Sequence, residues 1–261
     1  MPVCSVSAWS WSAQAYTGTR RTKRGGRMET SAAKIGRPRR RRPDAHVPLT
    51  IQPMFPAPFA FERLADPERL NAALRALFLA REHAGAYRNP DPYTERNEAL
   101  FESRFDLFQW PDPEIAELRE FCLSRTLQLV QRLNGYDAAR TRALRLRIES
   151  WFHITRRNGY FGVHNHPNAS WSGVYCVDDG HPDAGAEDSG KLTFLHPQAT
   201  GAMYVDNGNA ELKPPFNVQH AGYVLGAGDL VLFPSWLLHH VTPFAGDGER
   251  ITVAFNCAFP A

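Results

Sequence analysis

The chain after Arg140 restricts the fold most strongly, because it holds only short apolar runs separated by turn residues. The runs are rich in β-branched and aromatic side chains, and clusters of Gly, Pro, Asn and Asp divide them. Such runs predict short strands, and no helix of useful length interrupts them. This pattern is typical of a β-sandwich or barrel. The expected strands are residues 144–148, 151–154, 172–177, 191–195, 223–225, 230–233 and 251–255.

The first half of the chain predicts helices that pack against this β core. Residues 53–63 are apolar and Pro-rich, as expected for an extended segment. Asp66–Pro67 then precede apolar residues at helical spacing, which predicts a first helix. Pro111–Asp112–Pro113 open a second helical pattern that Asn134–Gly135 end. We therefore expect an all-β core with flanking helices.

The N-terminal tail accounts for the basic pI of about 8.7 of the whole chain. Residues 1–42 hold eleven Lys or Arg against the single acid Glu29, and since the whole chain carries +3, the other 219 residues carry −7. Residues 1–45 lack periodicity and are expected to be a disordered basic tail. Three interpretations of this tail remain open: it is a targeting segment, a weak nucleic-acid-binding arm, or sequence upstream of a true start at Met28. The mildly acidic remainder argues against nucleic-acid binding by the folded part.

Compartment and assembly follow only loosely from the sequence. No run of eighteen apolar residues occurs, so we expect no membrane span. Four cysteines are scattered without a CxxC pair, which favours reduced thiols and a cytoplasmic protein. The oligomeric state stays open, a homodimer included.

Two histidine sites far apart in the chain carry the first chemical signal. If the segment around His164 and His166 is extended, both imidazoles project from one face, because strand side chains repeat every second residue. His239 and His240 follow 73 residues after His166. Metal-binding jelly rolls draw ligands from an early and a late strand. Neighbours on a strand face opposite ways, so only one of the late pair can ligate, and periodicity leaves open which one.

Arg250 lies eleven residues beyond His239 and carries the second signal. Along a strand Arg250 and Thr252 share a face, so a guanidinium and a hydroxyl point the same way. Arg forms bidentate pairs with planar carboxylates. An Arg on an edge strand, paired with Glu249 or Asp247, is the structural alternative.

At this point the sequence resembles the Fe(II)/2-oxoglutarate-dependent oxygenases, and most closely a bacterial family within them. The resemblance covers residues 145–259 well, the helical region loosely and the tail not at all. Its residues are Trp151, His164–Pro167, Trp171–Val177, Gly190–Phe194, Gly228–Leu237, Arg250–Thr252 and Phe255–Asn256.

This resemblance implies a double-stranded β-helix (jelly roll, cupin-like) domain over residues 46–261, with helical support at about 60–140. It implies that His239 rather than His240 is the late metal ligand. It also implies Fe(II), 2-oxoglutarate and O₂ as cofactor and co-substrates. Oxidative decarboxylation of 2-oxoglutarate to succinate and CO₂ would accompany hydroxylation of a small-molecule or peptide substrate. The implied site residues are His164, His166 and His239 for the metal, and Arg250, Thr252 and Tyr175 for 2-oxoglutarate.

One position departs from the superfamily pattern. The usual facial triad has two histidines and one carboxylate, whereas residue 166 is His. A neutral imidazole leaves the metal centre one unit more positive and weakens selectivity against zinc, nickel and copper. Alternatively, His166 points away and leaves an open coordination position.

Two other classes remain open from the sequence. One is a three-His cupin dioxygenase that binds substrate directly and does not use 2-oxoglutarate. The other is a non-catalytic jelly-roll module that holds a structural metal. Polar irregular segments at 178–189 and 197–215 are expected at the barrel mouth, where loops choose substrates. His153 is expected in a loop or in solvent.

Overall fold

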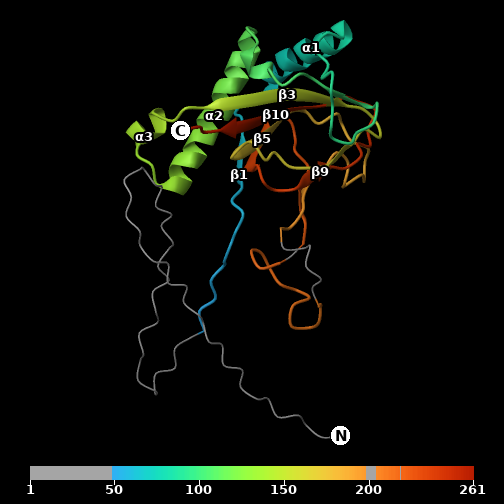
Figure 1. The fold of residues 1–261 in the computed structure, drawn as a ribbon. Coiled ribbons are helices and arrows are strands. Elements are labelled where there is room, and N and C mark those ends of the chain that lie inside the picture. Colours follow the sequence, from blue (N-terminus) through green and yellow to red (C-terminus); the bar gives the residue numbers. More distant parts are fainter. Residues whose placement is uncertain (1–48, 198–203, 218) are drawn as a thin grey trace, which may run out of the picture. The chain divides into compact units, whose positions relative to one another are not determined.

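The computed structural model describes residues 49–197, 204–217 and 219–261. The basic tail predicted for residues 1–45 lies outside the described residues. Residues 51–261 form one compact unit, which contains all the helices and strands described below. Figure 1 shows this unit as strands with helices along one side.

The core is a double-stranded β-helix, as predicted, built from two antiparallel sheets. The larger sheet has the order β1-β8-β5-β10-β3-β2 and the smaller sheet the order β4-β9-β6-β7. Buried side chains of β5 and β8 pack against those of β6, so the second apolar cluster joins the two sheets. The larger sheet comprises β1 (Ala60–Arg63), β2 (Leu100–Glu102), β3 (Arg147–Thr155), β5 (Trp171–Asp178), β8 (Asp229–Pro234) and β10 (Arg250–Ala258). The smaller comprises β4 (Phe161–His164), β6 (Leu192–Phe194), β7 (Ala221–Tyr223) and β9 (His239–Val241).

Two long helices cover the outer face of the larger sheet. They are α1 (Glu68–Ala84) and α2 (Pro113–Asn134), and Figure 1 shows both on the same side of β3, β10 and β5. A 3₁₀ turn, η1 (Leu107–Gln109), precedes α2, and the short α3 (Ala138–Arg142) follows it. Both long helices end at a glycine in the left-handed region, Gly85 at φ 73° and Gly135 at φ 65°. Glycine adopts this conformation without steric cost, which explains where each helix stops.

Strand β10 divides its side chains between two environments. Ile251 and Val253 are fully buried in the cluster beneath the helices. Burying each of these side chains contributes about 1.5–3 kcal/mol. Arg250 and Thr252 instead line a cavity between the two sheets. The apolar face therefore anchors β10 firmly, and its polar face is presented to the interior of the barrel.

The two ends of the barrel carry different groups. His164 pairs with His239 in the β4–β9 register, and β6 ends here too, because Phe194 pairs with His239. The segment 178–189 follows the opposite end of β5 and bonds to the loop before β10, with Asp183 N–H donating to the Ala245 carbonyl at 2.8 Å. The segment 178–189 therefore lies by the loop before β10, and its role in choosing a substrate stays a prediction.

Candidate metal centre

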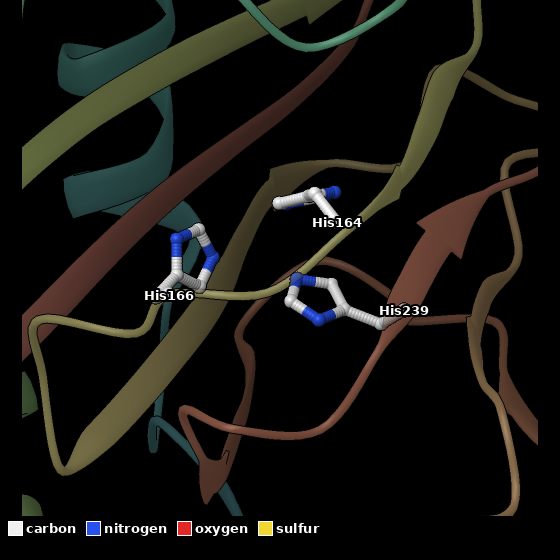
Figure 2. A group of neighbouring side chains, drawn as sticks. All are labelled: His164, His166 and His239. Atoms are coloured by element: carbon white, nitrogen blue, oxygen red, sulfur yellow. The ribbon is translucent and has the colours of Figure 1, made fainter.

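Three imidazoles meet at one end of the barrel. His164 is the last residue of β4, His166 lies two residues further on, and His239 is the first residue of β9. The ring centroids are 4.2 Å apart for His164 and His239, 4.9 Å for His164 and His166, and 5.2 Å for His166 and His239. One ring nitrogen of each lies within 4.8 Å of the others, and Figure 2 shows the rings gathered around one point. Within the described part of the chain, no carboxylate or thiol joins this group.

The backbone fixes the tautomer of two of these rings. His164 Nδ1 lies 2.8 Å from the Gly162 carbonyl, and His239 Nδ1 lies 2.8 Å from the Leu237 carbonyl. A carbonyl oxygen only accepts, so each Nδ1 carries the proton and donates it. Each Nε2 is then left with a free lone pair, which is the arrangement of a metal-ligating histidine.

His166 is held by its backbone and by an aromatic neighbour. Its backbone N–H donates to the Ser235 carbonyl at 2.9 Å, and its ring lies 5.7 Å from the Trp151 ring between centroids. His240, the neighbour of His239 on β9, lies outside the three-ring group. The late histidine that faces the others is thus His239, as the resemblance implies.

All three imidazoles are neutral at neutral pH. Burial lowers the pKa of His164 and of His239, and mutual repulsion with neighbouring histidines lowers both further. Burial, followed by repulsion from His164, lowers the pKa of His166 to about 3. Neutral imidazole is the form that binds a metal, so the protein environment favours ligation.

Arg250 is a buried cation that forms no ion pair within the part of the chain that the structure describes. Its side chain is 4% exposed, and its Nη2 has no hydrogen-bond partner. Two acids close in sequence bond to other cations: Glu249 accepts from Arg75 at 2.6 Å, and Asp247 accepts from Arg157 at 2.8 Å. Asp179 attracts the guanidinium electrostatically, but no ion pair joins the two among the described residues. Burial lowers the pKa of Arg250 from its ordinary value. An unpaired donor facing a cavity fits a planar carboxylate, which could take a bidentate position there.

Thr252 and Tyr175 have different positions. Thr252 lines the same cavity as Arg250 and the histidines, and its side chain is buried. Tyr175 lies on the helix face of β5, where its hydroxyl donates to Asn71 Oδ1 at 2.7 Å. Since Phe121 packs against the Tyr175 ring in this core, the phenol cannot reach the cavity. The prediction that Tyr175 binds 2-oxoglutarate is wrong.

A buried ionic network beside the histidines was missed by sequence reasoning. Glu102 on β2 accepts from Asn89 Nδ2 at 2.6 Å, forms an ion pair with Arg96, and lies 3.0 Å from His153 Nε2. Burial alone would raise the pKa of Glu102, but these contacts lower it to about 2. His153 is buried on β3 and lines the cavity, so its expected loop or solvent position is wrong. Nothing in the spacing of these residues predicts the contacts.

The network reaches the metal centre through one side chain. Trp151 Nε1 lies 3.1 Å from His153 Nε2, and the Trp151 ring packs on His166. Both Trp151 and His153 line the cavity that the three histidines share with Arg250. Trp151 therefore forms the cavity wall next to His166. The ionised Glu102 contacts His153, and His153 in turn contacts Trp151.

One family model matches part of this chain. Residues 149–256 match the model of the family described as "Putative 2OG-Fe(II) oxygenase". This match spans β3 to β10 and includes the three histidines and Arg250. No curated protein matches the chain.

Solved structures share the fold at low sequence identity. A prolyl-4-hydroxylase from Pseudomonas putida is 15% identical over 78% of this chain and 93% of its own, with a TM-score of 0.51. A prolyl hydroxylase from Trichoplax adhaerens, in complex with a hypoxia inducible factor oxygen degradation domain peptide fragment, is 13% identical over 77% of this chain and 83% of its own, with a TM-score of 0.51. AviO1 from Streptomyces viridochromogenes is 16% identical over 79% and 91%, also at 0.51. At such identities the likeness concerns the fold.

Proposed function

We propose, from the premise that residues 149–256 belong to the 2OG-Fe(II) oxygenase family, that His164, His166 and His239 hold the iron of this enzyme. The protein is an oxidoreductase that uses Fe(II), 2-oxoglutarate and O₂. The residues present fit that metal, because three neutral imidazoles converge and two of them direct a free Nε2 lone pair away from a bonded Nδ1.

Arg250 is the residue we assign to the distal carboxylate of 2-oxoglutarate, with Thr252 beside it. The observation that carries this assignment is the orphaned Nη2 of a buried guanidinium in the cavity that the histidines line. A carboxylate there would neutralise the charge and satisfy the donor at once. When bound, the iron and 2-oxoglutarate supply an oxidising chemistry that consumes O₂, releases succinate and CO₂, and hydroxylates the substrate.

The chain's own residues supply position and a dry environment. The apolar face of β10 anchors Arg250 under the helices, and the β4–β9 pairing sets the spacing of His164 and His239. Trp151 and Phe161, both buried, wall the cavity and exclude water. The protein thus orients the reacting groups, and the reactivity belongs to the bound cofactor.

The donor set has a consequence for metal choice. With His166 in the place of the usual carboxylate, the centre carries one more unit of positive charge. We propose that this enzyme discriminates iron from zinc, nickel and copper less strongly than enzymes with the usual triad do.

The substrate and the setting of the reaction belong to the same proposal. The structure contains no helix, within its described residues, with the length and hydropathy of a membrane span. We propose that the substrate is a small molecule or a peptide and that the enzyme works in the cytoplasm, which suits the free, buried thiols of Cys122, Cys176 and Cys257. Homodimer formation and weak nucleic-acid contact by the basic tail are further proposals, and the latter concerns residues outside the described range.

Anaerobic titration of the Fe(II)-loaded protein with 2-oxoglutarate tests the assignment. We expect a visible charge-transfer band for the wild-type protein and for His240→Ala, and no band for His239→Ala. On adding O₂, the wild-type protein and His240→Ala should release succinate, and His239→Ala should not. A folded His239→Ala protein that keeps the band, or a wild-type protein that shows neither the band nor succinate, would contradict the proposal.

A further inference from the structure

We propose that Gly190 is a positioning residue for co-substrate binding, because the absence of a side chain there lets Arg250 extend to the distal carboxylate of 2-oxoglutarate. Gly190 lies between the segment 178–189 and β6, far along the chain from Arg250. It contacts the stem of Arg250, not the cavity. The inference rests on the role proposed above for Arg250.

The contact between the two residues leaves no room for a methyl group. A Cβ built on Gly190 would lie 2.7 Å from Arg250 Cδ and 2.8 Å from Arg250 Nε. Carbon atoms at their optimal separation are about 3.5–4.0 Å apart, so both contacts are deeply repulsive. The Arg250 side chain therefore passes directly over residue 190 on its way into the barrel.

The strand that carries Arg250 cannot move aside. Arg250 pairs with Thr155 of β3, and a second glycine, Gly180, fits against its backbone. A Cβ on Gly180 would lie 2.7 Å from Arg250 N and 3.0 Å from Arg250 Cα. Phe244, which is 1% exposed, fills the space next to both glycines. The backbone of residue 250 is thus enclosed, and a methyl group at residue 190 would displace the guanidinium instead.

Residue 190 is equally unable to retreat. Its neighbour Ser189 bonds twice to Ala245: Ser189 Oγ donates to the Ala245 carbonyl at 3.2 Å, and Ala245 N–H donates to Ser189 Oγ at 2.8 Å. On the other side, Lys191 N–H donates to Thr242 Oγ1 at 2.8 Å. The segment is pinned on both sides of Gly190, so the clash falls on the flexible end of the Arg250 side chain.

The same segment offers a matched control. Gly190 has φ +57° and Gly185 has φ +82°, so alanine at either position meets the left-handed backbone that L residues rarely adopt. A Cβ on Gly185 has nothing within 4 Å. Gly185→Ala thus reports backbone strain alone, whereas Gly190→Ala reports the strain and the contact with Arg250.

The experiment measures 2-oxoglutarate affinity by anaerobic titration of wild-type protein, Gly190→Ala and Gly185→Ala, each loaded with Fe(II). We expect Gly190→Ala to weaken 2-oxoglutarate binding about tenfold or more, the scale of one charge-assisted hydrogen bond. Gly185→Ala should bind like the wild type, and the affinity for Fe(II) should be unchanged in both variants. Equal 2-oxoglutarate affinities for the two alanine variants would overturn the inference.

A second background separates this inference from the function on which it rests. Arg250→Ala removes the Cδ and Nε atoms, so Gly190→Ala should weaken 2-oxoglutarate binding no further there. If Arg250→Ala alone binds 2-oxoglutarate like the wild type, the role proposed for Arg250 fails. If Arg250→Ala weakens binding but Gly190→Ala does not, only the role of Gly190 fails. Should Gly190→Ala be insoluble, a soluble Gly190→Ala/Arg250→Ala protein supports the contact, and an insoluble one counts against it.

Discussion

Replacing Arg250 by methionine should make the ligand-free protein more stable while it weakens 2-oxoglutarate binding. The reason is the orphaned Nη2 of a side chain that is 4% exposed. Leaving one buried donor unsatisfied costs about 1–3 kcal/mol, and neutral apolar replacements of poorly compensated buried charges are often stabilising. Methionine keeps most of the apolar stem, so little packing is lost.

The magnitude can be followed by thermal melting. If the orphan donor costs about 1–3 kcal/mol, the unfolding free energy of the ligand-free Arg250→Met protein rises by that amount, and each kcal/mol shifts Tm by about 2–4 °C in a domain of this size. 2-Oxoglutarate, bound with the metal, raises the stability of the wild-type protein and so works against this difference. At a ligand concentration of 100 times the wild-type Kd the wild-type protein gains about 2.7 kcal/mol, and the variant, which binds 2-oxoglutarate more weakly, gains much less.

The assay compares melting curves of wild-type protein and variant, with a redox-inert divalent metal, in the absence and presence of 2-oxoglutarate. Arg75→Met is the control, because Arg75 is paired with Asp178 at 2.8 Å and with Glu249 at 2.6 Å. Loss of these half-exposed pairs should leave stability the same or lower by up to about 1 kcal/mol. The reasoning is refuted if ligand-free Arg250→Met melts below the wild type, or if 2-oxoglutarate stabilises both proteins equally.

Three further outcomes are expected. His166→Asp should raise the affinity for Fe(II) relative to Zn²⁺, because a carboxylate restores the usual donor set; an unchanged ratio in a metal competition assay would mean that residue 166 does not ligate. Stability of the metal-free protein should be complete above about pH 6.5 and fall as the pH drops toward about 3, because burial depresses the pKa of His166 and the unfolded chain binds protons first. Urea unfolding at pH 7.5, 6 and 5 measures this, and a flat profile contradicts it. Glu102→Gln should cost about 3–5 kcal/mol, because Arg96 loses its buried counter-charge; a change within 0.5 kcal/mol in urea unfolding would argue against the network.

The sequence was sufficient for the fold class and for the grouping of distant residues. Both long helices lie where their capping residues predict them, and the double-stranded β-helix is confirmed. The period of two in β10 correctly sends Arg250 and Thr252 to the cavity face. The short strands were harder: β4 and β9 have four and three residues, too few for periodicity to appear, and the strand expected at 223–225 is found at Ala221–Tyr223.

The errors at the site share a physical cause. Periodicity tells which residues share a face of a strand, but it does not tell whether that face meets helices or the opposite sheet. Tyr175 lies on β5 next to Val174, which lines the cavity, and Tyr175 consequently faces Asn71 on α1. The contact of His153 with Glu102 depends on the pairing of β2 with β3, which brings together residues 51 positions apart. Such contacts follow from topology and leave no local trace in the sequence.

His164 and His239 share a feature with a wider consequence: each ring is tethered to a carbonyl two residues earlier on its own stretch of chain, at Gly162 and Leu237. In many metal sites a separate carboxylate aims the ligand, so a change in one place misaligns another. Here the orientation of each ring depends only on a carbonyl of its own segment. The substrate-facing loops can consequently diverge between homologues without retuning the two ligands, and one barrel can be adapted to new molecules while its metal chemistry is kept.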